Sequence, residues 1–273
     1  DAYRLSRVFE AARPDVVLHA AAHKHVPMLE GNVVEAVQNN VGGSRTVADL
    51  AAAYGCSRLV LVSPDKAVEP ASIMGATKRL SELYVLALAR ARGVDFAVVR
   101  FGNVWGSVGS VVPIFREQIA AGGPVTVTHP DMTRYFMTIS EASQLVLQAA
   151  AIGGRGDLFV LDVGRPTRIA DHAEKMIRDA GLEPGRDVEV VYTGMRPGEK
   201  LDERLHADCD GPVEATEHPH VLRCRPPPRP LGEVATFISE IERAATASPA
   251  AEVARMLFDY VNGSPSASVG AER

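Results

Sequence analysis

An acid and an amine stand side by side at Asp65 and Lys66, two residues after the short apolar run of residues 59–62. A carboxylic acid and an amine held close together can donate and accept protons on one small substrate, which is general acid–base chemistry. Such work requires surroundings that lower the pKa of a lysine from about 10.4 and raise the pKa of an aspartate. The pair therefore predicts a catalytic site, and the alternative is a solvated ion pair in a surface loop.

A second lysine, Lys78, follows further along the chain. Met74 precedes it by four positions, so the two side chains would share one face of a helix. This spacing alone does not separate a functional lysine from an ordinary lysine on a helix surface.

The elements that must position these side chains alternate between strand and helix. Apolar runs predict buried strands over residues 16–20, 59–62 and 96–101, and helical periodicity predicts helices over residues 3–12, 33–54 and 75–92. Short connections between them indicate right-handed βαβ units, hence an α/β fold with a doubly wound parallel (Rossmann-type) sheet. Ligands bind such a sheet at the carboxyl ends of its strands, which is where Asp65 and Lys66 follow their strand.

The composition changes after Gly102, where a loop rich in glycine and serine begins. Beyond it, the pattern predicts helices over residues 114–121, 141–152 and 169–180, and strands over residues 125–128, 158–163 and 188–192. We predict a dinucleotide-binding domain over residues 1–110 and a smaller mixed α/β substrate lobe over residues 111–224. Residues 225–273 would then form a proline-rich linker, a last helix at about 231–245 and a disordered tail.

Composition restricts the class of protein. The chain has 273 residues, of which 46% are hydrophobic and 23% charged, as in soluble globular enzymes. A net charge of -5 without a basic stripe argues against binding nucleic acid. We expect a cytoplasmic protein, because no apolar run could span a bilayer and no signal peptide is visible.

Metal binding is the weaker interpretation of the histidines. His19, His23 and His25 lack a matching set of cysteine or acidic ligands, and the three cysteines are scattered without metal-type spacing. We therefore expect no metal. The small residues 20–22 would instead let backbone approach a dinucleotide beside the first strand. The G-x-G-x-x-G turn that normally opens such a fold does not precede that strand, so we expect an N-terminally truncated domain.

Six strings in order carry a resemblance to a known family. They are HAAAHKHVPMLE from His19, NNVGGS from Asn39, SPDKAVEPASIMGATK from Ser63, RFGNVWGSVGSVVPIF from Arg100, HPDMTRYFMT from His129 and RPGEKLDE from Arg196. Together they resemble the nucleotide-sugar 4,6-dehydratases of the polysaccharide-biosynthesis (CapD-like) group, in the extended short-chain dehydrogenase/reductase superfamily. The resemblance covers roughly residues 1–205. Met74 stands where the superfamily pattern has tyrosine, and is similar to the branch that dehydrates UDP-N-acetylglucosamine with retention at carbon 5.

The resemblance implies NAD as a tightly held cofactor that is regenerated in each turnover. Hydride would leave carbon 4 of the sugar and return to carbon 6 after water is lost. Asp65 would be the acid toward the carbon 6 oxygen, Lys66 the base at carbon 5, and Lys78 a contact to the nicotinamide ribose. The residues expected at the cofactor are His19, Ala20, Ala21, Asn40 and Lys78.

The resemblance also implies a set of substrate contacts: Lys24, Asn103, Arg134, Arg196 and Glu199. The asparagine and the two arginines would bind the diphosphate, since guanidinium groups match phosphate oxygens. The glutamate would hold the nucleotide ribose. The alternatives are a turn asparagine, surface arginines, a helix-capping glutamate and a solvated lysine.

Pro64 departs from the family pattern, in which a threonine hydroxyl at this position supports oxidation at carbon 4. Ser63 or Ser72 could supply that hydroxyl instead. The expected function is NAD-dependent 4,6-dehydration of a UDP-N-acetylhexosamine for polysaccharide or glycan synthesis. The alternatives are epimerisation of the same nucleotide sugar and a non-catalytic remnant that binds it. We expect a homo-oligomer, attached to the cytoplasmic face of the inner membrane only through an upstream segment, if at all.

Overall fold

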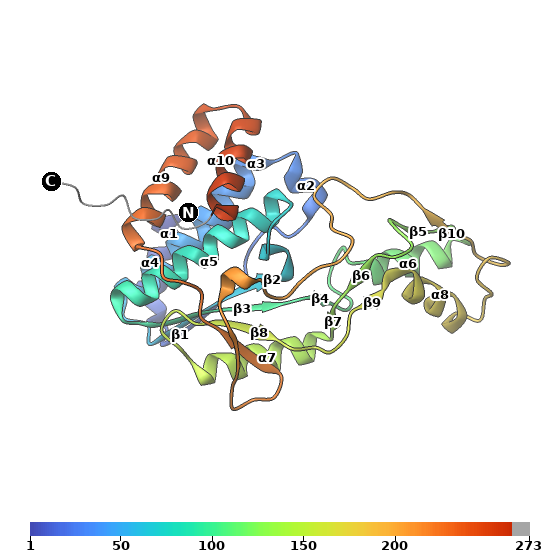
Figure 1. Cartoon of the computed structure of the whole chain (residues 1–273), viewed down its shortest axis with the longest axis horizontal. Helices are drawn as coiled ribbons and strands as arrows, with labels where there is room; N and C mark the ends of the chain where they lie inside the picture. Colours follow the sequence, from blue (N-terminus) through green and yellow to red (C-terminus); the bar gives the residue numbers. More distant parts are fainter. Residues whose placement is uncertain (264–273) are drawn as a thin grey trace.

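A six-stranded sheet lies at the centre of the larger part of the molecule (Figure 1). The computed structural model describes residues 1–263. The strands run in the order β1 (Val16–His19), β2 (Arg58–Pro64), β3 (Asp95–Phe101), β8 (Leu158–Leu161), β12 (Val221–Cys224) and β11 (Val213–Ala215). The first four are parallel, and the last two join antiparallel at the far edge. The predicted parallel α/β sheet is confirmed.

Apolar side chains alternate along the central strands and fill both faces of the sheet. On β2, Leu59 and Leu61 belong to one core and Val60 to the other, as expected where both faces are covered. The first core packs against α1 (Ala2–Ala12), α4 (Gly43–Ala53) and α5 (Ile73–Arg92). The second packs against α7 (Ile139–Ile152). Helices on both faces make the sheet doubly wound.

Helix α5 is buried along most of its length, from Ile73 to Ala89. Its N-cap is Ser72, whose hydroxyl accepts a hydrogen bond from the backbone of Gly75, and its left-handed C-cap is Gly93. The sequence predicts an amphipathic helix here. The helix is instead covered on its outer side by α9 (Leu231–Ala247) and α10 (Ala250–Asn262), which pack against it.

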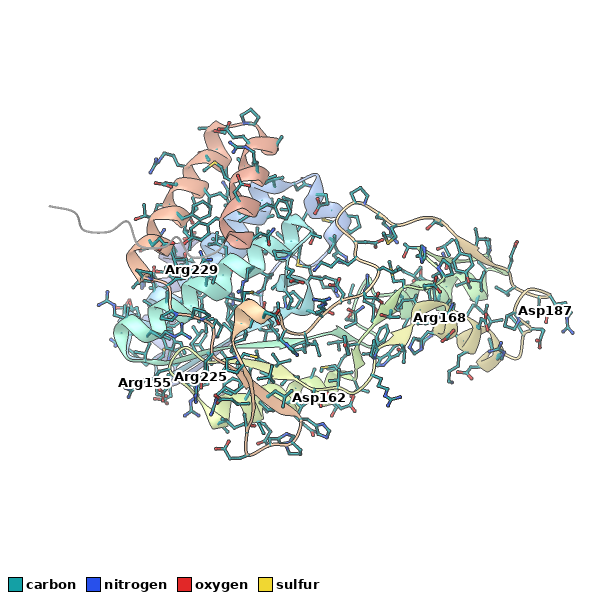
Figure 2. All side chains as sticks on the ribbon, viewed as in Figure 1. Arg155, Asp162, Arg168, Asp187, Arg225 and Arg229 are labelled. Atoms are coloured by element: carbon teal, nitrogen blue, oxygen red, sulfur yellow. The ribbon has the colours of Figure 1, made fainter. Side chains whose placement is uncertain are left out.

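A second, smaller lobe extends from one end of the sheet and has its own apolar core (Figure 1). It contains α6 (Val111–Ala120), β5 (Val125–Val127), α8 (Ile169–Asp179) and β10 (Val190–Tyr192). Figure 2 shows Asp187 at the outer end of this lobe. Two short strand pairs lead into the lobe: β4 (Asn103–Val104) with β7 (Phe136–Met137), and β6 (Thr133–Arg134) with β9 (Thr167–Arg168).

Other elements also differ from the sequence predictions. The helix expected over residues 33–54 is divided into α3 (Val33–Ala36), a π-helical turn (Val37–Gly42) and α4. Residues 111–224 were expected in the second lobe, but within them β8, β11 and β12 are strands of the main sheet and α7 covers one of its faces. Helix α10 is an additional helix. The predicted disordered tail falls on residues 264–273, which lie outside the described residues. Within residues 1–263, no helix is long and apolar enough to cross a bilayer.

Candidate active site

Asp65 and Lys66 lie at the carboxyl end of β2, as the sequence predicts. They form a short 3-10 turn (Asp65–Ala67) immediately after the strand. The first turn of α5 packs closely on this turn: a Cβ added at Gly75 would lie 2.2 Å from the carbonyl oxygen of Lys66. Glycine at position 75 therefore allows the helix that carries Met74 and Lys78 to approach the Asp65–Lys66 pair.

Lys66 lies between three polar groups. Its Nζ donates to Asp65 Oδ1 at 2.9 Å and to Asn103 Oδ1 at 3.3 Å, and it lies 3.8 Å from Glu203 Oε1. The two carboxyl side chains are only 1% and 3% exposed, while Lys66 is 22% exposed. Within residues 1–263, Asp65 Oδ2 and Glu203 Oε2 have no hydrogen-bond partner. Buried oxygens without partners are uncommon and costly, which points to a site that binds something polar.

Glu203 is the site residue that the sequence reasoning missed. It ends the RPGEKLDE string, so that string contained the signal. Burial raises the pKa of Glu203, and the nearby Asp65 carboxylate raises it further, against the opposing charges of Lys66, Arg134 and Lys200. The site therefore joins one amine to two acids, rather than to the single acid that was predicted.

Arg134 organises the segment that carries Glu203. Its guanidinium donates to the backbone carbonyls of Thr133, Leu201 and Lys200 at 2.6, 3.0 and 2.8 Å. The bonds to Leu201 and Lys200 attach the segment to β6 at the base of the second lobe. The predicted role of Arg134 at a phosphate remains a prediction, and most of its donors already hold protein carbonyls.

The other predicted substrate contacts lie nearer the surface. Arg196 is 56% exposed, and its backbone N–H donates to Glu199 Oε2 at 2.9 Å, so Glu199 acts here as a local cap. Lys24 is exposed, and Asn103 lies beside Lys66. Of the predicted substrate contacts, only Asn103 is therefore joined directly to the acid–base pair in this structure.

Lys78 and Met74 are both buried in the first turns of α5. Burial lowers the pKa of Lys78 to about 8. His19, at the end of β1, is affected in the same direction: burial, and then the charge of Lys78, lower its pKa to about 4. His19 is therefore neutral near pH 7, and its Nε2 lies 3.1 Å from the hydroxyl of Ser44.

The side chain of Asn40 is occupied by protein groups. It accepts from the backbone N–H of His23 at 2.8 Å and donates to the His23 carbonyl and to Thr77 Oγ1. These bonds attach the loop after β1 to α5. Ser63 is buried on the side of β2 that faces α5, near Glu82.

A cavity of about 700 Å³ lies along β1 and the π-helical turn. Its lining includes His19, Ala21, Asn39, Gly42 and Gly43, but neither Asn40 nor Lys78. Ala20 is exposed beside it. Small residues and glycines allow close approach of a ligand to backbone, so these residues fit one part of a dinucleotide. Among residues 1–263, no three His, Cys, Asp or Glu side chains are grouped as metal ligands.

The sequence profile of the polysaccharide biosynthesis protein family matches residues 1–226. The chain belongs to this family. It is 51% identical over 203 residues to the capsular polysaccharide biosynthesis protein CapD of Staphylococcus aureus. It is also 51% identical over 205 residues to the probable polysaccharide biosynthesis protein EpsC of Bacillus subtilis. These alignments cover 74% and 75% of the chain but 34% of each relative, so the chain spans about a third of their length.

Further similarities extend to enzymes with other names and to solved structures. A UDP-glucose 4-epimerase of Rickettsia canadensis is 38% identical over 194 residues, covering 70% of this chain and 55% of that protein. The structure of Pen from Bacillus thuringiensis matches 83% of this chain and 70% of its own, with a TM-score of 0.75 and 32% identity. A dTDP-glucose 4,6-dehydratase of Streptomyces venezuelae, solved with NAD, matches with a TM-score of 0.65 and 22% identity. That match covers 76% of this chain and 69% of the dehydratase, and shows the shared fold.

Proposed function

We propose that this chain carries the proton-transfer residues of an NAD-dependent nucleotide-sugar 4,6-dehydratase in polysaccharide biosynthesis, acting on a UDP-N-acetylhexosamine. The observation that carries this proposal is the partly buried Asp65–Lys66 contact, 2.9 Å long, at the carboxyl end of a parallel strand. Loss of water from a sugar needs an acid at the leaving hydroxyl and a base at the neighbouring carbon. An acid and an amine in contact meet both needs within one small site.

The direct contact lets one proton prepare both groups. Transfer of a proton from Lys66 Nζ to Asp65 Oδ1 produces a neutral amine and a carboxylic acid together. Lys66 then accepts the proton from carbon 5 of the sugar, while Asp65 gives its proton to the departing carbon 6 hydroxyl. Both residues return to the ion pair in which they started. Asn103 accepts from Lys66 and fixes the direction of the amine.

The cofactor and the nucleotide would be held on either side of this pair. Bound NAD would supply the acceptor and donor of hydride for the sugar. His19 and Ala21 would hold it at the cavity along β1, and Lys78 would reach its nicotinamide ribose from α5. Arg196, with its exposed guanidinium, would pair with the diphosphate together with Lys24. Arg134 would position the segment that carries Glu203 through its bonds to the Leu201 and Lys200 carbonyls.

Epimerisation is the second candidate, because curated relatives include UDP-glucose 4-epimerases. Inversion at carbon 4 moves a hydride and the hydroxyl proton, and it needs neither a base at carbon 5 nor an acid at carbon 6. It therefore leaves the Asp65–Lys66 pair without a task. This difference favours dehydration.

The test is to incubate the natural full-length protein with UDP-N-acetylglucosamine in deuterated water and to follow the sugar by NMR. We expect a 4-keto-6-deoxy product with deuterium at carbon 5. An intact sugar inverted at carbon 4 would identify an epimerase. An unchanged sugar, in a protein that binds NAD and the nucleotide, would refute catalysis and support a binding module.

A further inference from the structure

Glu203 is buried against the acid–base pair, and the roles described above give it no task. Its Oε1 lies 3.8 Å from Lys66 Nζ, its side chain is 3% exposed, and its Oε2 has no hydrogen-bond partner within residues 1–263. Ionised carboxylates are expensive to bury unless they are fully paired. A carboxyl group in this position is therefore better accommodated in its neutral form.

The charges around Glu203 do not supply a full partner. Lys66 contacts Asp65 more closely, at 2.9 Å, so its charge is shared between two acids. Arg134, on β6, donates to backbone carbonyls. Lys200, on the same segment as Glu203, donates to the Val68 carbonyl at 2.7 Å. The two buried carboxyl groups of Asp65 and Glu203 therefore share one amine, that of Lys66, as their cationic partner.

We propose that Glu203 is a positioning residue that carries a proton in the resting site and so allows Lys66 to pass its own proton to Asp65. This inference rests on the proposed function. The N–H bond of Lys66 breaks and an O–H bond forms on Asp65, so the pair stays at zero net charge. An ionised Glu203 would attract the ammonium of Lys66 across 3.8 Å more strongly than it would repel the Asp65 carboxylate, and would so favour the proton on Lys66. The amine would then be unable to act as a base.

The electrostatic surroundings agree with this geometry. Burial raises the pKa of Glu203, and the facing Asp65 raises it too; Lys66, Arg134 and Lys200 act in the opposite direction. When the pH rises through this raised pKa, Glu203 ionises and Lys66 retains its proton. Turnover should therefore fall on the alkaline side because of Glu203.

A carboxyl titration tests the protonation state without any need for activity. Glutamate labelled with carbon-13 at the carboxyl carbon gives one NMR resonance for each side chain, and E203Q removes and so assigns that of Glu203. We expect this resonance to report a protonated carboxyl group at about pH 7, where an exposed glutamate is ionised. A resonance that reports an ionised Glu203 at that pH would overturn the proposal.

Kinetics of the full-length protein test the consequence for catalysis. We expect wild-type kcat to fall about tenfold per pH unit beyond the alkaline limb. E203Q, which cannot ionise, should show its alkaline limb at a higher pH, where the Asp65–Lys66 pair loses its single proton, and its kcat should exceed that of E203A. An alkaline limb unchanged in E203Q would contradict the proposal. A wild-type protein that performs no dehydration would refute the proposed function, whereas the carboxyl titration would still decide the state of Glu203.

Discussion

Two clusters of buried charge lie in the main domain, and they differ in whether each charged group has partners. The first, here called the arginine cluster, consists of Arg79 and Glu82 on α5, Arg100 on β3, and Asp210. Arg100 donates to Glu82 Oε1 at 2.7 Å and to Asp210 Oδ2 at 2.6 Å, and Arg79 donates to the remaining oxygens at 3.0 and 2.9 Å. Two cations meet two anions, and all four carboxylate oxygens are bonded.

The second cluster, here called the Asp65 trio, consists of Asp65, Lys66 and Glu203. It has two acids for one amine, and one oxygen of each acid has no partner within residues 1–263. The pKa values follow the same division. Burial alone would raise the pKa of Glu82, but the Arg100 guanidinium lowers it, whereas the pKa of Glu203 stays raised. Complete pairing fixes charges for structure, and incomplete pairing leaves protons free to move.

Removing Arg100 should give the largest effect on stability. Arg100→Met leaves Glu82 and Asp210 buried without their main partner, which should reduce the free energy of unfolding by about 3–5 kcal/mol. Urea unfolding measures this change. The matched control is Arg155→Met, which breaks an ion pair with Asp95 whose arginine is 70% exposed (Figure 2). That change should cost no more than about 1 kcal/mol. Equal losses in the two variants would show that the arginine cluster does not stabilise the fold.

Changing the Asp65 trio should strongly reduce activity but have little effect on stability. Asp65→Asn removes the proposed acid and should lower kcat by about 10²–10⁴-fold. The same change removes an incompletely paired buried charge, so the free energy of unfolding should fall by less than about 1 kcal/mol or rise. Product formation and urea unfolding are measured on the same preparation. A loss of stability as large as that of Arg100→Met would mean that the trio is structural, and the comparison would fail.

The sequence predicted the first three parallel strands, and the adjacent Asp65 and Lys66 at the end of one of them, because both depend on local patterns. Apolar runs mark the strands, and Asp65 and Lys66 are adjacent in the chain. Glu203 could not be placed in this way, because it reaches Lys66 only through a segment that Arg134 attaches to β6. Tertiary contacts of this kind leave no periodic signal in a single sequence.

The same limitation explains the errors in the helices. The long amphipathic helix expected at α5 is buried because α9 and α10 cover it, and this packing depends on residues more than a hundred positions away. The π-helical turn at residues 37–42 directs Asn40 toward His23 and Thr77. The hydrogen bonds of the Asn40 side chain with His23 and Thr77 stabilise that local change of helix geometry, and the apolar pattern of the segment does not indicate them.

His19 allows a smaller test of the comparison between paired and unpaired buried groups, because it is a buried group that stays uncharged. Its pKa in the folded chain is lowered to about 4, chiefly by burial and then by Lys78, from an ordinary value of 6.5. A depressed pKa means that the unfolded chain binds the proton first. The contribution of His19 to stability is therefore complete above pH 6.5 and is lost as the pH falls toward 4. His19→Gln cannot bind this proton. Between pH 6.5 and 4, the free energy of unfolding should therefore fall by about 2–3 kcal/mol less in this variant than in the wild type. Urea unfolding at several pH values measures the difference between the two proteins. If the free energy of unfolding depended on pH in the same way in both proteins, His19 would be accessible to water and would carry a charge at low pH. Buried groups with incomplete pairing would then be limited to the Asp65 trio.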